Sequence, residues 1–97
     1  MLRHVVLVQL KEDVEAGSTE MLLEELSRLP GLIPDISSYS FGTDLGIAEG
    51  NYDLGIVAEF VDADAFGRYV VHPAHQAFVV EKLRPLMAQR VALQFEI

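Results

Sequence analysis

The alternation of apolar and polar side chains in residues 52–60, YDLGIVAEF, constrains the fold more than any other feature of the chain. Successive side chains of a β-strand point to opposite faces, so one face of this segment is wholly apolar or aromatic. That face carries Tyr52, Leu54, Ile56, Ala58 and Phe60, and the other carries Asp53, Gly55 and Glu59. Residues 3–11 and 90–97 alternate in a similar way, and residues 36–42, ISSYSFG, have the serine and aromatic content of a strand. The sequence therefore predicts a protein built around a small sheet.

A helical pattern lies between the first two predicted strands. Residues 18–29 repeat leucine at the spacing of one helix face, namely at Leu22, Leu26 and Leu29. The expected N-cap of this helix is Ser18 or Thr19. A cluster of turn-forming residues is expected to end it, namely Pro30, Gly31 and Pro34.

A second helical region precedes the last strand. Asp62 or Asp64 can cap it, and its apolar side carries Phe66, Tyr69 and Val70. Pro73 interrupts this region, and proline is favoured at the first position of a helix. We therefore expect His72 to be the N-cap of a further helix that runs from Pro73 to about Leu86. The apolar stripe of that helix is Val79, Leu83 and Leu86.

The order of elements, β-α-β-β-α-β, is that of a ferredoxin-like α+β fold in a single domain over residues 1–97. In this fold the helices cover one face of the sheet. We expect the apolar sides of the three amphipathic strands to form the covered face. The other face is expected to be mixed, with Val5, Leu7 and Val57 beside Asp53, Glu59, Arg90 and Glu96. A partly apolar open face indicates a partner sheet.

Composition narrows the possible functions. The formal net charge of −8 argues against binding to nucleic acid or to an anionic membrane surface, since both need a basic patch. No apolar run approaches the ~20 residues of a membrane span, and the alternation of the first strand does not resemble a signal peptide. The absence of cysteine excludes disulfides, thiolate zinc sites and a cysteine nucleophile, and fits a reducing cytoplasm.

The candidate chemistry centres on the HPAH segment, residues 72–75. A neutral imidazole is the commonest general base near pH 7, which makes His75 a candidate base. A phenol within reach, here Tyr69, can hold the oxygen of a developing enolate. The break at Pro73 can turn both side chains toward one cavity between helices and sheet, and His4 can line the same cavity.

Structural alternatives exist for these residues. His72 and His75 have the spacing of a reciprocal helix cap, and Tyr69 can be a core aromatic residue. The H-x-x-H spacing is compatible with zinc, but no glutamate occupies the H-E-x-x-H position, so we expect no metal ligands among these histidines. A hard cation held by carboxylates and carbonyls at an interface is a further alternative. No dinucleotide fingerprint, nucleophile elbow or Schiff-base lysine is present, and no cofactor is expected.

Residues 52–78, YDLGIVAEFVDADAFGRYVVHPAHQAF, resemble the signature of the stress-responsive dimeric α/β-barrel (Dabb) domain. The pattern is a Tyr-Asp strand, an acidic-capped helix, a tyrosine and then His-Pro-x-His-x-x-Phe. The segments RHVVLVQLK and LIPDISSYSFGTDL also match this family in place and order, so the resemblance spans almost the whole chain. It implies a ferredoxin-like protomer whose sheet packs face to face on that of a second copy to form a barrel.

The same resemblance implies two kinds of function. Some members resemble stress-response proteins without assigned chemistry, and others are similar to polyketide cyclases of the olivetolic-acid type. The cyclases catalyse an intramolecular aldol condensation without a cofactor. The resemblance makes His75 the base and Tyr69 its partner, with His4 in the pocket, and we expect His4, His72 and Phe78 to contact an apolar or aromatic ligand. The alternatives are a non-catalytic stress-response or ligand-binding dimer and a cofactor-independent oxygenase or isomerase of a neighbouring α/β-barrel family.

Overall fold

The computed structural model describes residues 1–97 and confirms the predicted order of elements. The sheet consists of β1 (Leu2–Leu10), β2 (Ser38–Thr43), β3 (Leu54–Phe60) and β4 (Met87–Glu96). The helical layer consists of α1 (Ser18–Leu32), α2 (Ala63–Val71), α3 (Pro73–Ala77), the π-helix η1 (Phe78–Leu83) and the 3₁₀-helix η2 (Arg84–Leu86). Each predicted strand and helical region is present, with boundaries that differ by a few residues.

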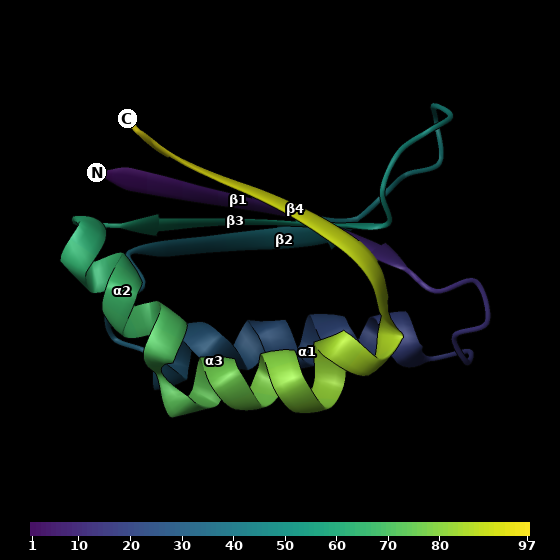
Figure 1. Ribbon diagram of the computed structural model, residues 1–97, viewed down its shortest axis with the longest axis horizontal. Helices are drawn as coiled ribbons and strands as arrows, with labels where there is room; N and C mark the ends of the chain where they lie inside the picture. The colour runs from purple at the N-terminus through teal and green to yellow at the C-terminus, as the bar shows by residue number, and fades with distance from the viewer.

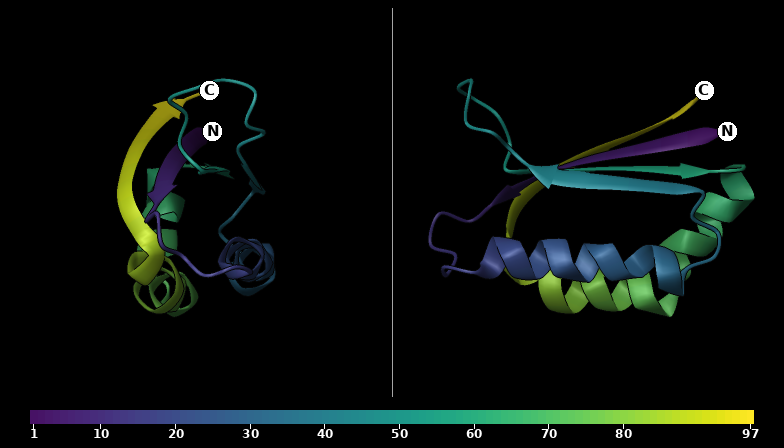
Figure 2. Two further views of the ribbon diagram at one scale, coloured as in Figure 1. Left: turned by 90° about the vertical axis from the view of Figure 1, so that its right-hand side faces the viewer. Right: turned by 180° about the vertical axis from the view of Figure 1, so that it is seen from behind.

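The strands form one antiparallel sheet in the order β2-β3-β1-β4. The helices all lie on one face of this sheet and leave the other face uncovered (Figures 1 and 2). The two termini lie at the same end of the sheet, where the Ile97 amide donates to the Met1 carbonyl at 3.0 Å. This is the ferredoxin-like arrangement that the element order predicts.

The core lies between the covered face of the sheet and the helices. The predicted leucine stripe of α1, at Leu22, Leu26 and Leu29, is buried there in one cluster with residues of β1 and β3. Phe60 is the largest fully buried side chain, and it contacts the rings of Phe66 and Tyr69 with centroid separations of 5.5 and 4.9 Å. An aromatic cluster therefore joins α2 to the sheet and fixes the position of Tyr69.

The predicted N-cap of α1 is wrong, and the prediction for its C-terminal end is only partly right. Its N-cap is Gly17, at a φ of 91°, and no side chain caps the helix. At the other end the helix continues through Pro30 to Leu32. Proline in a last turn removes only one hydrogen bond, so it need not end the helix there. The helix ends before Pro34, because a residue that precedes proline is forced out of the helical region, and Ile33 is extended.

The second helical region begins as predicted and ends differently. Asp62 caps α2 by accepting a hydrogen bond from the Ala65 amide at 2.8 Å. His72 caps α3 with Pro73 in its first turn, also as predicted. The expected single helix from Pro73 to Leu86 is wrong, because α3 passes into η1 and η2. Pro85 has no N–H to complete a regular α-helical turn, which is consistent with this change.

The orientation of β4 differs from the expectation for its apolar side. Paired residues of antiparallel strands point to the same face, and the pairing of Val8 with Arg90 places Arg90 on the covered face. The apolar side of β4 lies instead on the open face, which carries the exposed side chains of Leu7, Val91, Leu93 and Phe95. Glu96 pairs with Leu2, which packs against the core, so the expectation that Arg90 and Glu96 belong to the mixed open face is wrong. The prediction failed because both sides of β1 are apolar and do not specify which side of β4 faces the helices.

The loop between β2 and β3 rises from the open side of the sheet (Figures 1 and 2). Two of its apolar side chains, Leu45 and Ile47, are 83% and 84% exposed. Together with the apolar side of β4 they give the open side of the molecule more apolar surface than the sequence alone indicates. No helix of the fold combines the length and the apolar character that crossing a lipid bilayer requires.

Candidate functional site

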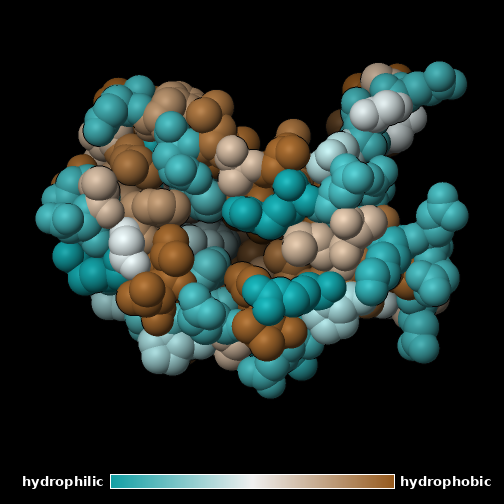
Figure 3. Space-filling model, in the orientation of Figure 1, coloured by the Kyte–Doolittle hydropathy of each residue, from teal (hydrophilic) through white to brown (hydrophobic).

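A cavity of about 490 Å³ lies between the covered face of the sheet and the helices. Figure 3 shows it as a hollow in the middle of the face presented to the viewer. Its wall is mostly apolar, with Val6, Ile56, Phe66, Val70, Phe78, Val79, Leu83, Met87 and Ala92. The polar lining groups are His4, Tyr39, Tyr69, His75, Arg84, Arg90 and Gln94. A few polar groups in an apolar concavity are typical of sites for small molecules.

Tyr69 and His75 come together at this cavity, as the sequence predicts. Tyr69 lies in the last part of α2 and His75 in α3, and the extended residue His72 between the two helices turns the chain. The two rings pack with their centroids 4.2 Å apart. The hydroxyl of Tyr69 shares a hydrogen bond of 2.9 Å with the hydroxyl of Tyr39 from β2.

The His75 ring is held by one of its nitrogens. Nδ1 lies 3.1 Å from the carbonyl oxygen of Val70, and a carbonyl can only accept, so Nδ1 carries the proton. Nε2 has no partner within the chain. No buried polar side-chain atom lacks a hydrogen bond, so this unpartnered nitrogen must be accessible to solvent. His75 contacts a carbonyl and not the free N–H groups of a helix end, which contradicts the reciprocal-cap interpretation for this residue.

His4 lies on β1 and reaches the cavity from the sheet side. Only 5% of its surface is exposed, and its ring centroid lies 4.9 Å from that of Phe66. The Gln94 amide nitrogen lies 2.9 Å from Nδ1. With the amide as donor, Nδ1 accepts and Nε2 carries the proton of the neutral ring.

Of the two other residues predicted to contact a ligand, Phe78 and His72, only Phe78 lies at the cavity. Phe78, the first residue of η1, lines the cavity. His72 does not line it: its Nδ1 accepts a hydrogen bond from the Ala74 amide at 3.1 Å and caps α3. The structure thus brings His4, Tyr69, His75 and Phe78 together and leaves His72 outside.

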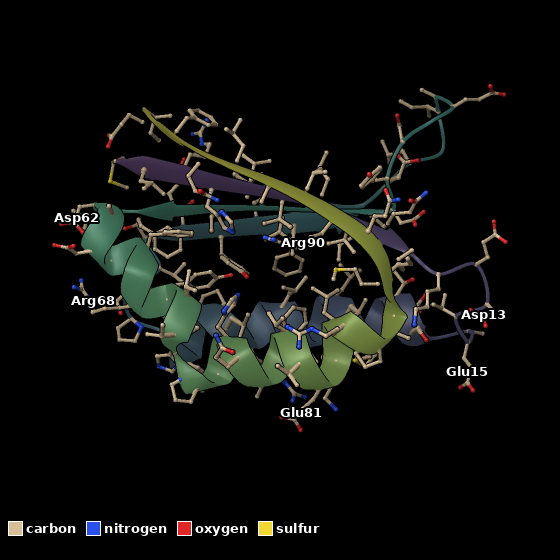
Figure 4. The ribbon with its side chains drawn as sticks, viewed as in Figure 1. Asp13, Glu15, Asp62, Arg68, Glu81 and Arg90 are labelled. Atoms are coloured by element: carbon tan, nitrogen blue, oxygen red, sulfur yellow. The ribbon has the colours of Figure 1, made fainter.

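Four polar lining residues were missed by the sequence analysis, namely Tyr39, Arg84, Arg90 and Gln94. A sequence signal for Tyr39 exists, because Tyr39 and Phe41 alternate with serines and therefore share one face of β2. The pairing of Tyr39 with Ala58 places that face on the covered side of the sheet. For β4 the alternation is misleading, because it predicts that the polar side of the strand faces away from the helices. Figure 4 shows Arg90 between β4 and the helical layer.

The environment keeps the histidines of the cavity neutral at pH 7. Burial lowers the pKa of His75; the hydrogen bond to Val70 opposes this effect, and the charges of Arg90 and His72 add to it. Burial, with smaller contributions from Arg90 and His75, lowers the pKa of His4 from 6.5 to about 4. Burial also raises the pKa values of Tyr69 and Tyr39, so both hydroxyls stay protonated. The site therefore offers neutral imidazoles beside phenolic donors.

The burial of His4 predicts a pH dependence of folding. Between pH 6.5 and about 4 the unfolded chain binds a proton at His4 that the folded chain does not bind. The free energy of unfolding is therefore expected to fall by roughly 2–3 kcal/mol as the pH drops through this window. The lowered pKa of His75 acts in the same direction. Urea unfolding at fixed protein concentration measures the effect, and a His4→Gln variant should flatten it; equal slopes for variant and parent would contradict this origin.

A second hollow, of about 570 Å³, lies on the open side of the sheet beneath the β2–β3 loop. Leu7, Gly55 and Asn51 are among its lining residues, and it contains none of the histidines. No group of three or more histidine, aspartate or glutamate side chains is arranged to hold a metal ion. Of these two hollows, only the one between the sheet and the helices is lined by histidines, namely His4 and His75.

The chain matches a known protein family over almost its whole length. The model of the stress-responsive A/B barrel domain, Dabb, matches residues 2–97. An uncharacterized protein of Streptomyces coelicolor is 36% identical over 81 residues, which cover 81% of this chain and 84% of that protein.

Solved structures agree with this assignment. The crystal structure of a dimeric ferredoxin-like protein of Thermobifida fusca is 40% identical, with a TM-score of 0.91 over 99% of this chain and 90% of that one. Hydroxynitrile lyase of Passiflora edulis shares the fold at 19% identity, with a TM-score of 0.86 over 99% and 92% of the two chains. With the family match over almost its full length, this chain belongs to the stress-responsive A/B barrel domain (Dabb) family.

Proposed function

We propose that the chain forms a homodimer and that its cavity binds a small apolar or aromatic molecule with an enolisable carbonyl, on which it performs cofactor-free acid–base chemistry. The observation that carries this proposal is the unpartnered Nε2 of His75, on a ring that packs against the ring of Tyr69 at a mostly apolar cavity. The hydroxynitrile lyase of Passiflora edulis supports it to the extent that the same fold carries an enzyme.

The fixed tautomer of His75 suits a general base. Because Nδ1–H donates to the Val70 carbonyl, the lone pair of the neutral ring lies on Nε2, which is the nitrogen that can accept a proton. The same hydrogen bond strengthens when the ring becomes an imidazolium, which favours acceptance of a proton. The lowered pKa of His75 keeps the ring in its basic form at neutral pH.

The two tyrosine hydroxyls suit the acid side of the reaction. They share one hydrogen bond, so if Tyr39 donates to Tyr69, the proton of Tyr69 is free for a ligand oxygen. Charge that develops on that oxygen would be spread through both hydroxyls, and such chains strengthen cooperatively. In the proposed step His75 removes the proton alpha to a carbonyl, and Tyr69 stabilises the enolate oxygen.

The proposed dimer forms through the open face of the sheet. The exposed side chains of Leu7, Val91, Leu93 and Phe95 supply its apolar surface. Arg3 gives that surface a polar boundary. Its Nε donates to Glu59 Oε2 at 2.9 Å, and its Cζ lies 5.9 Å from the centroid of the Phe95 ring. The dimeric relative of Thermobifida fusca supports this assembly.

Proton exchange tests the function without knowledge of the natural product. The protein is incubated in heavy water with aryl ketones and aryl β-keto esters, and the loss of the alpha-proton signal is followed by NMR. We expect exchange above the buffer rate for compounds that bind. Binding without exchange for the whole panel would favour the non-catalytic ligand-binding alternative, and an oxygen-dependent product would favour the oxygenase.

A further inference from the structure

The arginines of the chain fall into two groups. Three are paired with carboxylates at 2.9 Å: Arg3 with Glu59, Arg28 with Glu24, and Arg68 with Asp35. The other two, Arg84 and Arg90, have no carboxylate within 4.0 Å. These two are the arginines that line the cavity.

The lack of carboxylate partners for Arg84 and Arg90 is unexpected in a chain with this composition. The chain has 15 aspartates and glutamates and only 7 lysines and arginines, so carboxylates are abundant partners. Even so, no aspartate or glutamate lines the cavity. The cavity is therefore a positively charged region in an acidic protein, and its unpaired guanidinium groups are available to a ligand.

The two arginines reach the cavity from different elements. Arg84 is the first residue of η2, and Arg90 lies on the covered side of β4, between β4 and the helices (Figure 4). Both are exposed, which places them at the edge of the cavity, whereas His4, Tyr69 and His75 lie deeper. The charge of Arg90 contributes to the pKa values of all three deeper groups, so it acts across the site.

We propose that the cavity selects a ligand that carries a carboxylate, bound by Arg90 and Arg84 at the cavity edge, on an apolar or aromatic body that fills the interior. Guanidinium groups bind carboxylates through paired hydrogen bonds in a planar geometry, and an apolar wall suits the rest of the molecule. The carboxylate preference stands on the arginines alone. Only the placement of the reacting carbonyl at Tyr69 and His75 rests on the proposed function.

Calorimetric titration with 2-naphthoate and with 2-naphthamide tests the preference, because the two probes share a ring system and differ in charge. We expect the acid to bind at least about tenfold more tightly than the amide. Arg90→Gln should lose most of this preference, and the double variant with Arg84→Gln should lose all of it. Arg28→Gln, which removes an exposed arginine of α1, should retain it.

Circular dichroism and thermal melting confirm that each variant is folded before titration. No measurable binding of 2-naphthoate, equal affinity for the acid and the amide, or a preference that survives in the double variant would overturn the proposal. The titration tests the carboxylate site independently of the proposed acid–base chemistry. If the parent protein prefers the acid but catalyses no proton exchange, only the proposed chemistry is disproved. If it catalyses exchange but binds acid and amide equally, only the carboxylate site is disproved.

Discussion

Replacing His75 by alanine is expected to lower the rate of alpha-proton exchange by about 10²–10⁴-fold, the usual contribution of a general base. The variant removes the accessible Nε2 and leaves the Tyr69–Tyr39 hydrogen bond in place. His75 is only partly buried, so the domain should remain folded. NMR exchange rates for the parent and the variant, measured at the same saturation with ligand, give the comparison.

A second substitution and a matched control separate chemistry from structure. His75→Asn retains an N–H donor for the Val70 carbonyl but has no basic nitrogen, so it should lose as much activity as His75→Ala. Gln76 donates to the same carbonyl at 2.7 Å without lining the cavity. Gln76→Ala should therefore keep the exchange rate within a small factor. An asparagine variant as active as the parent would show that the imidazole is not the base.

The pH dependence of the exchange rate of the parent protein also tests whether His75 is the base. The basic form of His75 is the unprotonated ring, and burial lowers its pKa. The exchange rate should be constant around neutral pH and should fall on acidification only below the ordinary range of histidine. A rate that falls already above pH 7 would assign the base to another group.

The sequence predicts the part of the site that depends on local structure. His72, Pro73 and His75 lie within one helix start, and the cap at His72 makes the turn that brings His75 to Tyr69. Proline chemistry and capping preferences act over a few residues, so a single sequence contains them. The same holds for the Asp62 cap and the leucine stripe of α1.

The part of the site that depends on strand orientation could not be predicted. Arg90 and Gln94 reach the cavity because β4 pairs with β1 in a register that turns its polar side toward the helices. A shift of one residue would reverse every side chain of the strand, and only the partner strand fixes that choice. Alternation identifies β4 as a strand, but its apolar side serves the open face and not the core.

Introducing a charge on the open face is expected to abolish the dimer. Leu93 lies on this face between Val91 and Phe95, pairs with Val5 of β1, and is 61% exposed in the protomer. In Leu93→Asp a two-fold interface would bury two unpaired carboxylates, each at a cost of several kcal/mol. Since each 1.4 kcal/mol is a factor of ten, the dissociation constant should rise by at least about 10³-fold. Analytical ultracentrifugation over a concentration series measures the shift.

Val80→Asp is the matched control, because Val80 is also exposed but belongs to η1 in the helical layer. It should leave the dimer intact. Circular dichroism shows whether the separated Leu93→Asp protomer stays folded, and Leu93→Ser, which adds no charge, should give a smaller rise in the dissociation constant. If Leu93→Asp remains dimeric while Val80→Asp dissociates, the subunits associate through the helices. In that case the apolar side of β4 has a different partner.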